Sequence, residues 1–336
     1  MTQHPLAVTA RDLVKTYPGG VRALAGLSID VRPGEVFALL GPNGAGKSTA
    51  IKILTTLARP DSGTATVGGH DVIGHPGRVR RVIGVVAQKS GSDPVATGRE
   101  NLVLQGRLYG LSGTAVRRRA TELLDRFGLA SAADRPTRTY SGGMLRRLDV
   151  ALGLIHRPQV LFLDEPTTGL DPDARTALWD EIARLAAGES LAIVLTTHYL
   201  DEADRLAHRL AIADRGRVVA TGTPDELKSS LRGDAVHIDL QAPPGDEAVV
   251  LRALAAVPAL REVTLDGRRI SARADDGAGA VPAALAALDQ AATPAAAVTV
   301  ARPSLDDVYL RHTGRRFADA DNAAGASALA AMAGAR

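Results

Sequence analysis

The sequence contains no cysteine, few aromatic residues and no apolar run long enough to cross a membrane. Without cysteine among its 336 residues, the chain can form neither disulfides nor thiolate metal sites. Aromatic residues make up only 3%, which leaves little material for stacking nucleic-acid bases. The longest apolar runs, such as Leu191–Leu195, are far shorter than the roughly 18 residues that a membrane helix needs. If the protein serves a membrane process, another chain must supply the membrane-spanning segments.

An excess of charge of either sign is also missing. The 40 basic and 37 acidic side chains leave a formal net charge of +3, so we expect no nucleic acid as the main partner. Residues 1–5 show no basic segment followed by an apolar core, and we therefore expect no secretory signal. The length is sufficient for two domains with separate cores.

A glycine-rich loop with the pattern G-x-x-x-x-G-K-[ST] is the strongest signal in the chain. It follows the apolar run Val36–Leu40, which we predict to be a strand buried on both faces, and it precedes a helical pattern that continues to Ala58. In such a P-loop, backbone N–H groups surround phosphate oxygens, the lysine faces the terminal phosphates and the serine holds magnesium. The alternative is a plain glycine-rich turn with a solvated lysine. The loop comprises Gly41, Pro42, Asn43, Gly44, Ala45, Gly46, Lys47, Ser48 and Thr49.

Polar side chains follow three other predicted strands. The apolar run 160–163 ends in two carboxylates, of which Asp164 is placed to bind magnesium and Glu165 to orient and deprotonate a water molecule. Gln88 and His198 also stand at strand ends, where they can reach a metal ion, a water or a γ-phosphate. Each signal also has an alternative interpretation: the carboxylates could belong to a turn, the glutamine could be solvated, and the histidine could be structural.

A helical insertion separates these strands and ends in a second glycine motif. Residues 97–154 show helical apolar spacing, and Ser141 can cap the last helix of this segment. The adjacent Gly142 and Gly143 permit the close approach of an anion to the helix N-terminus. A glycine-containing N-cap without a ligand is the alternative.

The pattern changes from Val236 onward. Strand and helix signals follow in the order β-α-β-β-α-β, which predicts a small ferredoxin-like unit, and residues 304–310 predict a closing helix capped by Ser304. After Gly314 the chain consists mostly of alanine, glycine and small polar residues, so we expect disorder beyond about residue 318.

Together these motifs resemble, in order, those of the ATP-binding subunit of an ABC (ATP-binding cassette) transporter, over about residues 7–231. By this resemblance Gln88 is the Q-loop, Ser141-Gly142-Gly143 the signature and His198 the switch, whereas 161–165 is Walker B and 169–171 the D-loop. The segment 140–149 is similar to the daunorubicin/doxorubicin-resistance branch of drug-export ATPases. It departs from the commonest signature, Leu-Ser-Gly-Gly-Gln, by having Tyr140 and Met144 at the first and last positions.

The resemblance implies an α/β P-loop ATPase domain with a RecA-like core, an antiparallel β subdomain and a helical subdomain at about 92–155. We expect this domain to span 1–231, an accessory α+β domain 232–314 and a disordered tail 315–336. The resemblance implies ATP and Mg²⁺ as cofactors. The residues implied to bind ATP are Tyr17, which would stack on adenine, Gly41–Thr49, Ser141, Gly142, Gly143 and Asp171. Those implied to bind Mg²⁺ are Ser48, Gln88 and Asp164, and those implied in catalysis are Glu165, His198 and Gln88.

The family also implies partners. Two cassettes close head to tail, so that the signature of one faces the phosphate bound by Lys47 of the other, and a separate membrane-spanning subunit exports a drug or antibiotic-like compound. The protein would then lie at the cytoplasmic face of the membrane, and its accessory domain would assist dimerisation or regulation, or merely pack. One alternative is a soluble ABC-type ATPase that acts on ribosomes or nucleic acid. The other alternative is a regulatory or binding module that does not hydrolyse ATP. The residues expected for hydrolysis are nevertheless present, namely Lys47, Asp164, Glu165 and His198, and they argue against this alternative.

Overall fold

The computed structural model describes residues 5–188 and 190–322. They fold into two compact units, of which the first contains the chain up to Pro224 together with the segment from Phe317 onward, and the second contains Asp225–Arg316. Helix α8 (Pro224–Ser229) therefore lies almost entirely within the second unit. No helix in these described ranges is long and apolar enough to cross a membrane.

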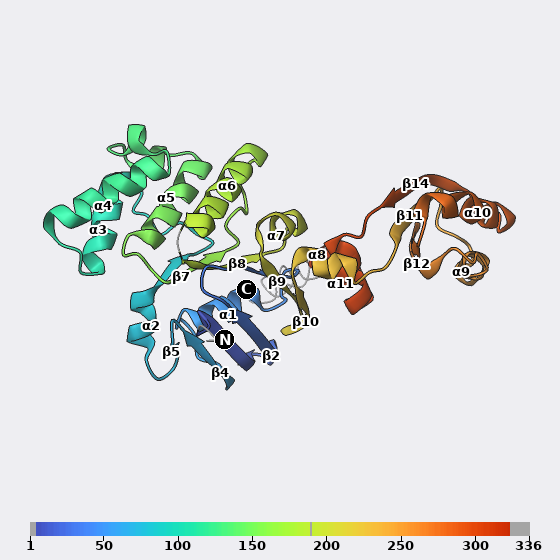
Figure 1. Cartoon of the computed structure of the whole chain (residues 1–336), viewed down its shortest axis with the longest axis horizontal. Coiled ribbons are helices and arrows are strands. Elements are labelled where there is room, and N and C mark those ends of the chain that lie inside the picture. The colour runs from blue at the N-terminus through green and yellow to red at the C-terminus, as the bar shows by residue number, and fades with distance from the viewer. Residues whose placement is uncertain (1–4, 189, 323–336) are drawn as a thin grey trace. The chain divides into compact units, whose positions relative to one another are not determined.

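A six-stranded sheet forms the centre of the first unit, with the strand order β10-β9-β3-β8-β7-β6 (Figure 1). All neighbours pair in parallel except β10, which is antiparallel to β9. The predicted strands of the core are confirmed, and the carboxyl ends of β3, β7 and β8 meet at one edge. The bounds are β3 (Val36–Leu40), β6 (Ile83–Val86), β7 (Val160–Asp164), β8 (Ala192–Thr197), β9 (Arg209–Asp214) and β10 (Arg217–Gly222).

A second, antiparallel sheet of the first unit has the order β2-β1-β4-β5. One cluster of buried apolar side chains joins it to helix α1 and the main sheet. Strand β2 begins at Val21, directly after the Tyr17–Val21 turn, because pairing with β1 keeps the whole segment extended. The bounds are β1 (Val8–Tyr17), β2 (Val21–Val31), β4 (Ser62–Val67) and β5 (His70–Asp71).

Helices cover the main sheet and build the helical insertion. In Figure 1, α3, α4 and α5 lie together, and α5 also packs against β6. Helix α1 ends at Leu54, short of the predicted Ala58, because the hydroxyl of Thr55 bonds to the carbonyl of Ile51 and Thr56 adopts a φ of 66°. The bounds are α1 (Lys47–Leu54), α2 (Pro76–Val82), α3 (Gly98–Leu108), α4 (Gly113–Arg126), α5 (Gly142–Leu154), α6 (Pro172–Gly188) and α7 (Leu200–Leu206), with short 3₁₀ turns at Ala130–Ala132 and Thr137–Thr139.

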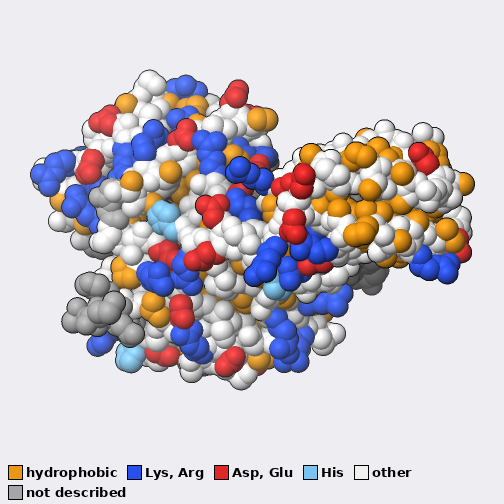
Figure 2. Space-filling model, turned by 45° about the vertical axis from the view of Figure 1, so that its right-hand side comes forward, with side chains coloured by type: hydrophobic (Ala, Val, Ile, Leu, Met, Phe, Trp, Pro, Cys, Tyr) orange, Lys and Arg blue, Asp and Glu red, His pale blue; other side chains and the backbone are white. Residues whose placement is uncertain are grey.

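The second unit has the predicted β-α-β-β-α-β order. Its antiparallel sheet has the strand order β12-β13-β11-β14, and apolar side chains of α9 and α10 form a core with this sheet. Figure 2 shows many hydrophobic side chains on the surface of this unit. Val249 and Val300 are among its exposed large apolar residues. The bounds are β11 (Asp234–Leu240), α9 (Glu247–Ala255), β12 (Arg261–Asp266), β13 (Arg269–Ala274), α10 (Gly277–Gln290), β14 (Ala295–Ala301) and α11 (Leu305–Thr313).

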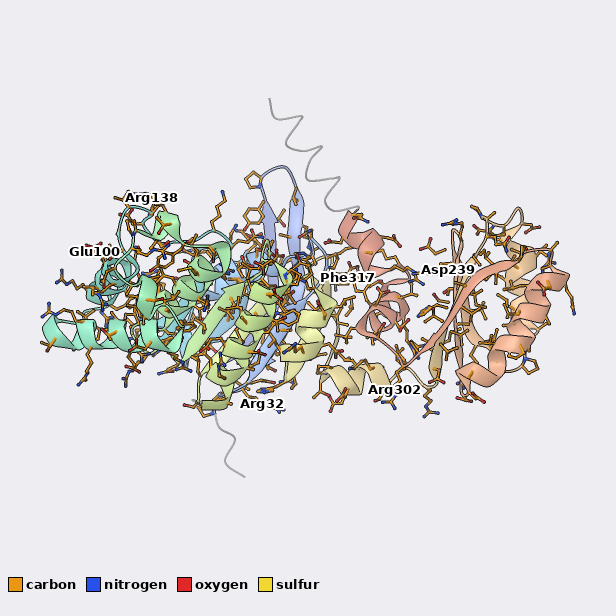
Figure 3. All side chains as sticks on the ribbon, turned by 90° about the horizontal axis from the view of Figure 1, so that it is seen from above. Arg32, Glu100, Arg138, Asp239, Arg302 and Phe317 are labelled. Carbon is orange, nitrogen blue, oxygen red and sulfur yellow. The ribbon has the colours of Figure 1, made fainter. Side chains whose placement is uncertain are left out.

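The expectation of disorder over the whole segment 315–336 is wrong for its first part. Residues 317–322 are helical, and Phe317, labelled in Figure 3, is buried together with Ala320. These two side chains lie one turn apart on the same helix face, and the alanines around them favour a helix. Residues 323–336 lie outside the described part of the chain.

Candidate functional site

A cavity of about 410 Å³ lies beside the glycine-rich loop at the carboxyl edge of the main sheet. It unites residues from four distant parts of the sequence, namely the end of β1 with the start of β2, the loop after β3 with the start of α1, the end of β6 and the end of β7. The lining residues are Tyr17, Val21, Arg22, Ala23, Asn43, Gly44, Gly46, Lys47, Ser48, Thr49, Gln88 and Glu165. An anionic ligand with an aromatic base would find both a basic loop and an aromatic ring here.

The loop has the backbone that a phosphate cradle requires. Gly46 is the N-cap of α1 and has a φ of 101°, and a Cβ at this position would collide with the carbonyl oxygen of Ala23. The side chain of Lys47 is only 4% exposed, and its Nζ donates to the carbonyls of Gly41 at 2.7 Å and Pro42 at 3.1 Å. The free N–H groups at the start of α1 therefore face the cavity beside a buried cation.

Three of the predicted site residues converge on the carboxylate of a fourth, Glu165. The Nζ of Lys47 lies 3.3 Å from Oε1 of Glu165, which is 6% exposed. Oε2 of Glu165 accepts a hydrogen bond from Nε2 of Gln88 at 2.9 Å. The Nδ1 of His198 lies 3.4 Å from the same Oε2. The ends of β3, β6, β7 and β8 thus meet in a single ionic network.

This network sets the proton affinity of the carboxylate. Burial by itself raises the pKa of Glu165, but the contact with His198 and the charge of Lys47 outweigh it and lower this pKa to about 2. Burial also lowers the pKa of Lys47, and the charge of Glu165 opposes that change. Glu165 is therefore ionised at neutral pH, and it becomes a stronger base whenever Lys47 turns to another anion.

The oxygen atoms near Asp164 suit a hard divalent cation. Oδ1 of Asp164 accepts hydrogen bonds from Ser48 Oγ at 3.2 Å and Thr196 Oγ1 at 2.6 Å. Carboxylate and hydroxyl oxygens of this kind are the ligands that Mg²⁺ prefers. The side-chain amide of Gln88 instead contacts Glu165. Of the three predicted magnesium ligands, Ser48 and Asp164 are therefore in contact with each other.

The signature and D-loop residues lie together at another place. Gly143 approaches Ala174 so closely that an added Cβ would lie 3.0 Å from the side chain of Ala174. Oδ1 of Asp171 accepts a hydrogen bond from the N–H of the same Ala174 at 2.9 Å. Ser141 caps α5 by accepting from the N–H of Met144, as predicted. Among the described residues that line the cavity, none comes from the signature or the D-loop.

Sequence reasoning missed two buried polar residues of α5. Arg146 and Asp149 are buried, whereas the neighbouring apolar side chains of Leu145 and Leu152 are only half buried. Arg146 donates to main-chain carbonyls of the segment around Glu165. Their burial had one signal in the sequence: Arg146 and Asp149 stand three residues apart in α5, a helix whose apolar residues cover most of its circumference.

Family comparisons agree with this geometry. The family model of ABC transporters matches residues 24–168, and that of the C-terminal domain of DrrA1-3-like ATP-binding proteins matches residues 222–313. The chain is 47% identical over 317 residues to the daunorubicin/doxorubicin resistance ATP-binding protein DrrA of Streptomyces peucetius, covering 93% of this chain and 94% of that protein. It is 40% identical to the Nod factor export ATP-binding protein I of Ralstonia nicotianae, covering 93% and 95% of the two chains.

Solved structures with the same fold are ATP-binding cassettes. CbiO1 from Clostridium perfringens, part of the ABC transporter complex CbiONQ, matches with a TM-score of 0.63 at 27% identity over 67% of this chain and 92% of that one. A dimeric cassette in a post-hydrolysis state, bound to ADP and Pi, matches with a TM-score of 0.59 at 26% identity over 64% and 98%. The α/β P-loop ATPase fold is therefore confirmed. The chain belongs to the daunorubicin/doxorubicin-resistance family of ABC transporter ATP-binding proteins and is an ATP-hydrolysing subunit of an exporter.

Proposed function

We propose that this ATPase drives the efflux of a drug or antibiotic-like hydrophobic compound through a separate membrane-spanning subunit. The names of the resistance and export relatives support this function. The protein would act at the cytoplasmic face of the membrane, with an ATPase domain of residues 1–231, an accessory domain of 232–314 and a tail of 315–336.

The observation that carries the mechanism is the buried pair of Lys47 and Glu165 beside the cavity. In this mechanism Tyr17 stacks on adenine, and the loop 41–49 holds the phosphates with its N–H groups and Lys47. Ser48, Asp164 and Gln88 would hold Mg²⁺, which would supply charge neutralisation at the phosphates. Glu165 takes a proton from the attacking water, and His198 contacts the γ-phosphate.

A second copy of the chain would complete the site. Ser141, Gly142, Gly143 and Asp171 lie together but do not belong to the cavity lining among the described residues. We infer that they face the nucleotide of a partner cassette in a head-to-tail dimer. Because this contact exists only with bound ATP, ATP binding favours the closed dimer and hydrolysis reopens it.

The decisive variant is Glu165→Gln. It preserves the shape of the side chain but removes the base, so we expect kcat to fall by roughly 10²–10⁴-fold while ATP binding persists and a closed dimer accumulates on gel filtration. Glu181→Gln is the matched control, because Glu181 is also buried but pairs with Arg126 and Arg184. Equal turnover of Glu165→Gln and the parent protein would refute the role of Glu165.

Transport itself requires the membrane subunit. Cells that express both subunits should accumulate less of a fluorescent hydrophobic drug than cells in which the ATPase carries Glu165→Gln. Stimulation of ATP turnover by ribosomes or nucleic acid, together with unchanged drug accumulation, would favour the soluble ABC-type ATPase instead.

A further inference from the structure

Arg146 of helix α5 is a buried cation whose hydrogen-bond partners are main-chain carbonyls. Its side chain is 7% exposed. The guanidinium donates through Nε to Pro166 O at 2.6 Å, through Nη1 to Ala87 O at 2.6 Å, and through Nη2 to Asp164 O at 3.1 Å and Glu165 O at 3.2 Å. One side chain thus joins the end of β7, the loop that follows it and the start of the Q-loop.

The backbone at Glu165 needs such a partner. Glu165 has a φ of 48°, which is uncommon for a residue with a Cβ and costs free energy that the surroundings must offset. In this conformation the carbonyls of three successive residues, 164–166, accept from the same guanidinium. Buried carbonyls without donors are costly, and the planar fork of an arginine can serve several at once.

The same helix holds the Q-loop at two points on either side of Gln88. Arg146 contacts the carbonyl of Ala87, and Asp149, one turn later, accepts a hydrogen bond from Ser90 Oγ at 2.8 Å. Burial raises the pKa of Asp149, whereas the bond from Ser90 and the charge of Arg146 oppose that change. Because Gln88 and Glu165 are themselves hydrogen-bonded, α5 fixes both ends of this catalytic contact.

We propose that Arg146 is a positioning residue for ATP hydrolysis. It orients the carboxylate of Glu165 and the amide of Gln88 relative to the N-terminus of α5, where Ser141 is the cap. Ser141 and Arg146 are five residues apart, about 7.5 Å along a rigid helix, so a displacement of the signature also displaces the base. This inference rests on the proposed role of Glu165 as the residue that activates water.

Arg119 of α4 provides a matched control. It is also buried, and it donates to the carbonyl of Leu154 at 3.0 Å and to Glu122 at 2.6 Å, at the other end of α5. Replacing either arginine removes a buried guanidinium and leaves main-chain carbonyls without this donor, one at Leu154 for Arg119 and four for Arg146. Only Arg146 contacts the loop that carries Glu165, so a purely structural effect should be common to both variants.

The first experiment compares steady-state kinetics and thermal unfolding of the full-length variants. Arg146→Gln should lower kcat by about 10-fold to 100-fold with KM for ATP within about twofold, because misplacing a catalytic group reduces kcat without weakening binding. Arg119→Gln should reduce the melting temperature by a similar amount but keep the parental kcat. Arg146→Lys should restore part of kcat, because it keeps a positive donor at this position. The restoration should be only partial, because an ammonium group can donate to fewer carbonyls than the guanidinium. This variant also replaces Arg146→Gln in the comparison if Arg146→Gln does not fold.

The second experiment is a double-mutant cycle with Glu165→Gln. If Arg146 acts through Glu165, adding Arg146→Gln to Glu165→Gln leaves the residual turnover within about twofold, because the group to be positioned is already gone. Additive losses, an unchanged kcat in Arg146→Gln, or an equal loss of kcat in Arg119→Gln would overturn the proposal. Full turnover in Glu165→Gln alone would instead refute the assignment of Glu165 as the base.

Discussion

Each unit of the molecule contains a buried ionic cluster, and the two clusters differ in how completely their groups are paired. In the second unit, Oδ1 of Asp307 lies 3.6 Å from Nε2 of His237, and Oδ2 lies 3.7 Å from Nη2 of Arg273. The same carboxylate closes a capping box with Ser304 at the start of α11. This cluster uses its charges to join a helix to a sheet.

The cluster of the first unit, formed by Lys47, Glu165 and His198, lines a cavity and can still bind a ligand there. Lys47 pairs with Glu165, but its two hydrogen bonds go to uncharged carbonyl oxygens, which an anion would replace. The buried Nδ1 of His198 makes no hydrogen bond to the described residues beyond its 3.4 Å contact with Oε2 of Glu165. The comparison teaches that buried charge alone does not mark a functional site, whereas an incompletely bonded charge cluster that lines a cavity does.

Replacing the cation of each cluster should affect nucleotide binding in the first unit and not in the second. Lys47→Met should weaken ATP binding about 1,000-fold, because it removes the cation proposed to face the terminal phosphates, and truncating one partner of a desolvated charge pair costs about 2–5 kcal/mol of binding free energy. Arg273→Met removes an equally buried cation of the second unit and should leave the affinity within about twofold. Isothermal titration calorimetry measures both, and an unchanged affinity of Lys47→Met would contradict the proposed phosphate site.

Removing the anion of the second cluster should affect stability without affecting turnover. Asp307→Asn leaves Arg273 and His237 without their carboxylate and weakens the cap of α11, at a cost of about 3 kcal/mol. Hydrogen exchange of β11 amides should accelerate, while the fluorescence of Trp179, the single tryptophan, follows the first unit unchanged. Comparable destabilisation of both units would contradict the separation of the two clusters.

Acid should act on the two clusters in different pH ranges. In the folded protein the pKa of Glu165 is about 2, whereas its ordinary value is 4.5. The ionised Glu165 therefore contributes fully to the stability of the fold above pH 4.5, and this contribution is lost as the pH falls toward 2. Burial lowers the pKa of His237 below 6.5. The charges of Arg316, Arg269 and Arg273 add to this change, and the charge of Asp307 opposes it. The contribution of His237 to the stability of the fold is therefore lost as the pH falls below 6.5.

Neutral variants separate these contributions. Glu165→Gln should reduce the loss of stability below pH 4.5 by about 2–3 kcal/mol, measured by Trp179 fluorescence in urea. His237→Gln should flatten the pH dependence of hydrogen exchange in β11 below pH 6.5. His156 of the first unit also has a pKa lowered by burial, so each comparison must be made within one unit. Identical acid profiles for Glu165→Gln and the parent would show that the network does not hold this carboxylate ionised.

The sequence was sufficient to predict the strands and the residues that follow them. Gln88, Glu165 and His198 stand at the ends of apolar runs, and Lys47 lies in the glycine-rich loop after another such run. The rule that parallel strands end at one edge brought these residues together. The end of α1 at Leu54 was not predictable from apolar spacing, because a hydroxyl bond of Thr55 and the backbone of Thr56 decide it.

Contacts within the site were less predictable. Arg146 has partners that lie 18 to 59 residues away and are main-chain carbonyls, which leave no mark in the side-chain pattern. The preference of Gln88 for Glu165 over the Ser48–Asp164 pair likewise depends on distances between strand ends. Local patterns thus predicted which residues reach the site, and only tertiary structure shows which atoms they contact.

The smallest expected effect on ATP affinity concerns Asp321, a carboxylate of the chain that is hydrogen-bonded to the glycine-rich loop. Oδ1 of Asp321, in the helical segment 317–322, accepts a hydrogen bond from the backbone N–H of Asn43 at 2.7 Å, and its charge raises the pKa of Lys47 against the effect of burial. A carboxylate at this amide competes with phosphate oxygens for the same donors, so Asp321→Asn should strengthen ATP binding by about threefold to fivefold. Asp319→Asn removes the same charge from an exposed position of the same segment and should change the affinity less. Equal changes in both variants, measured by calorimetry, would show that net charge rather than contact with the loop determines the affinity.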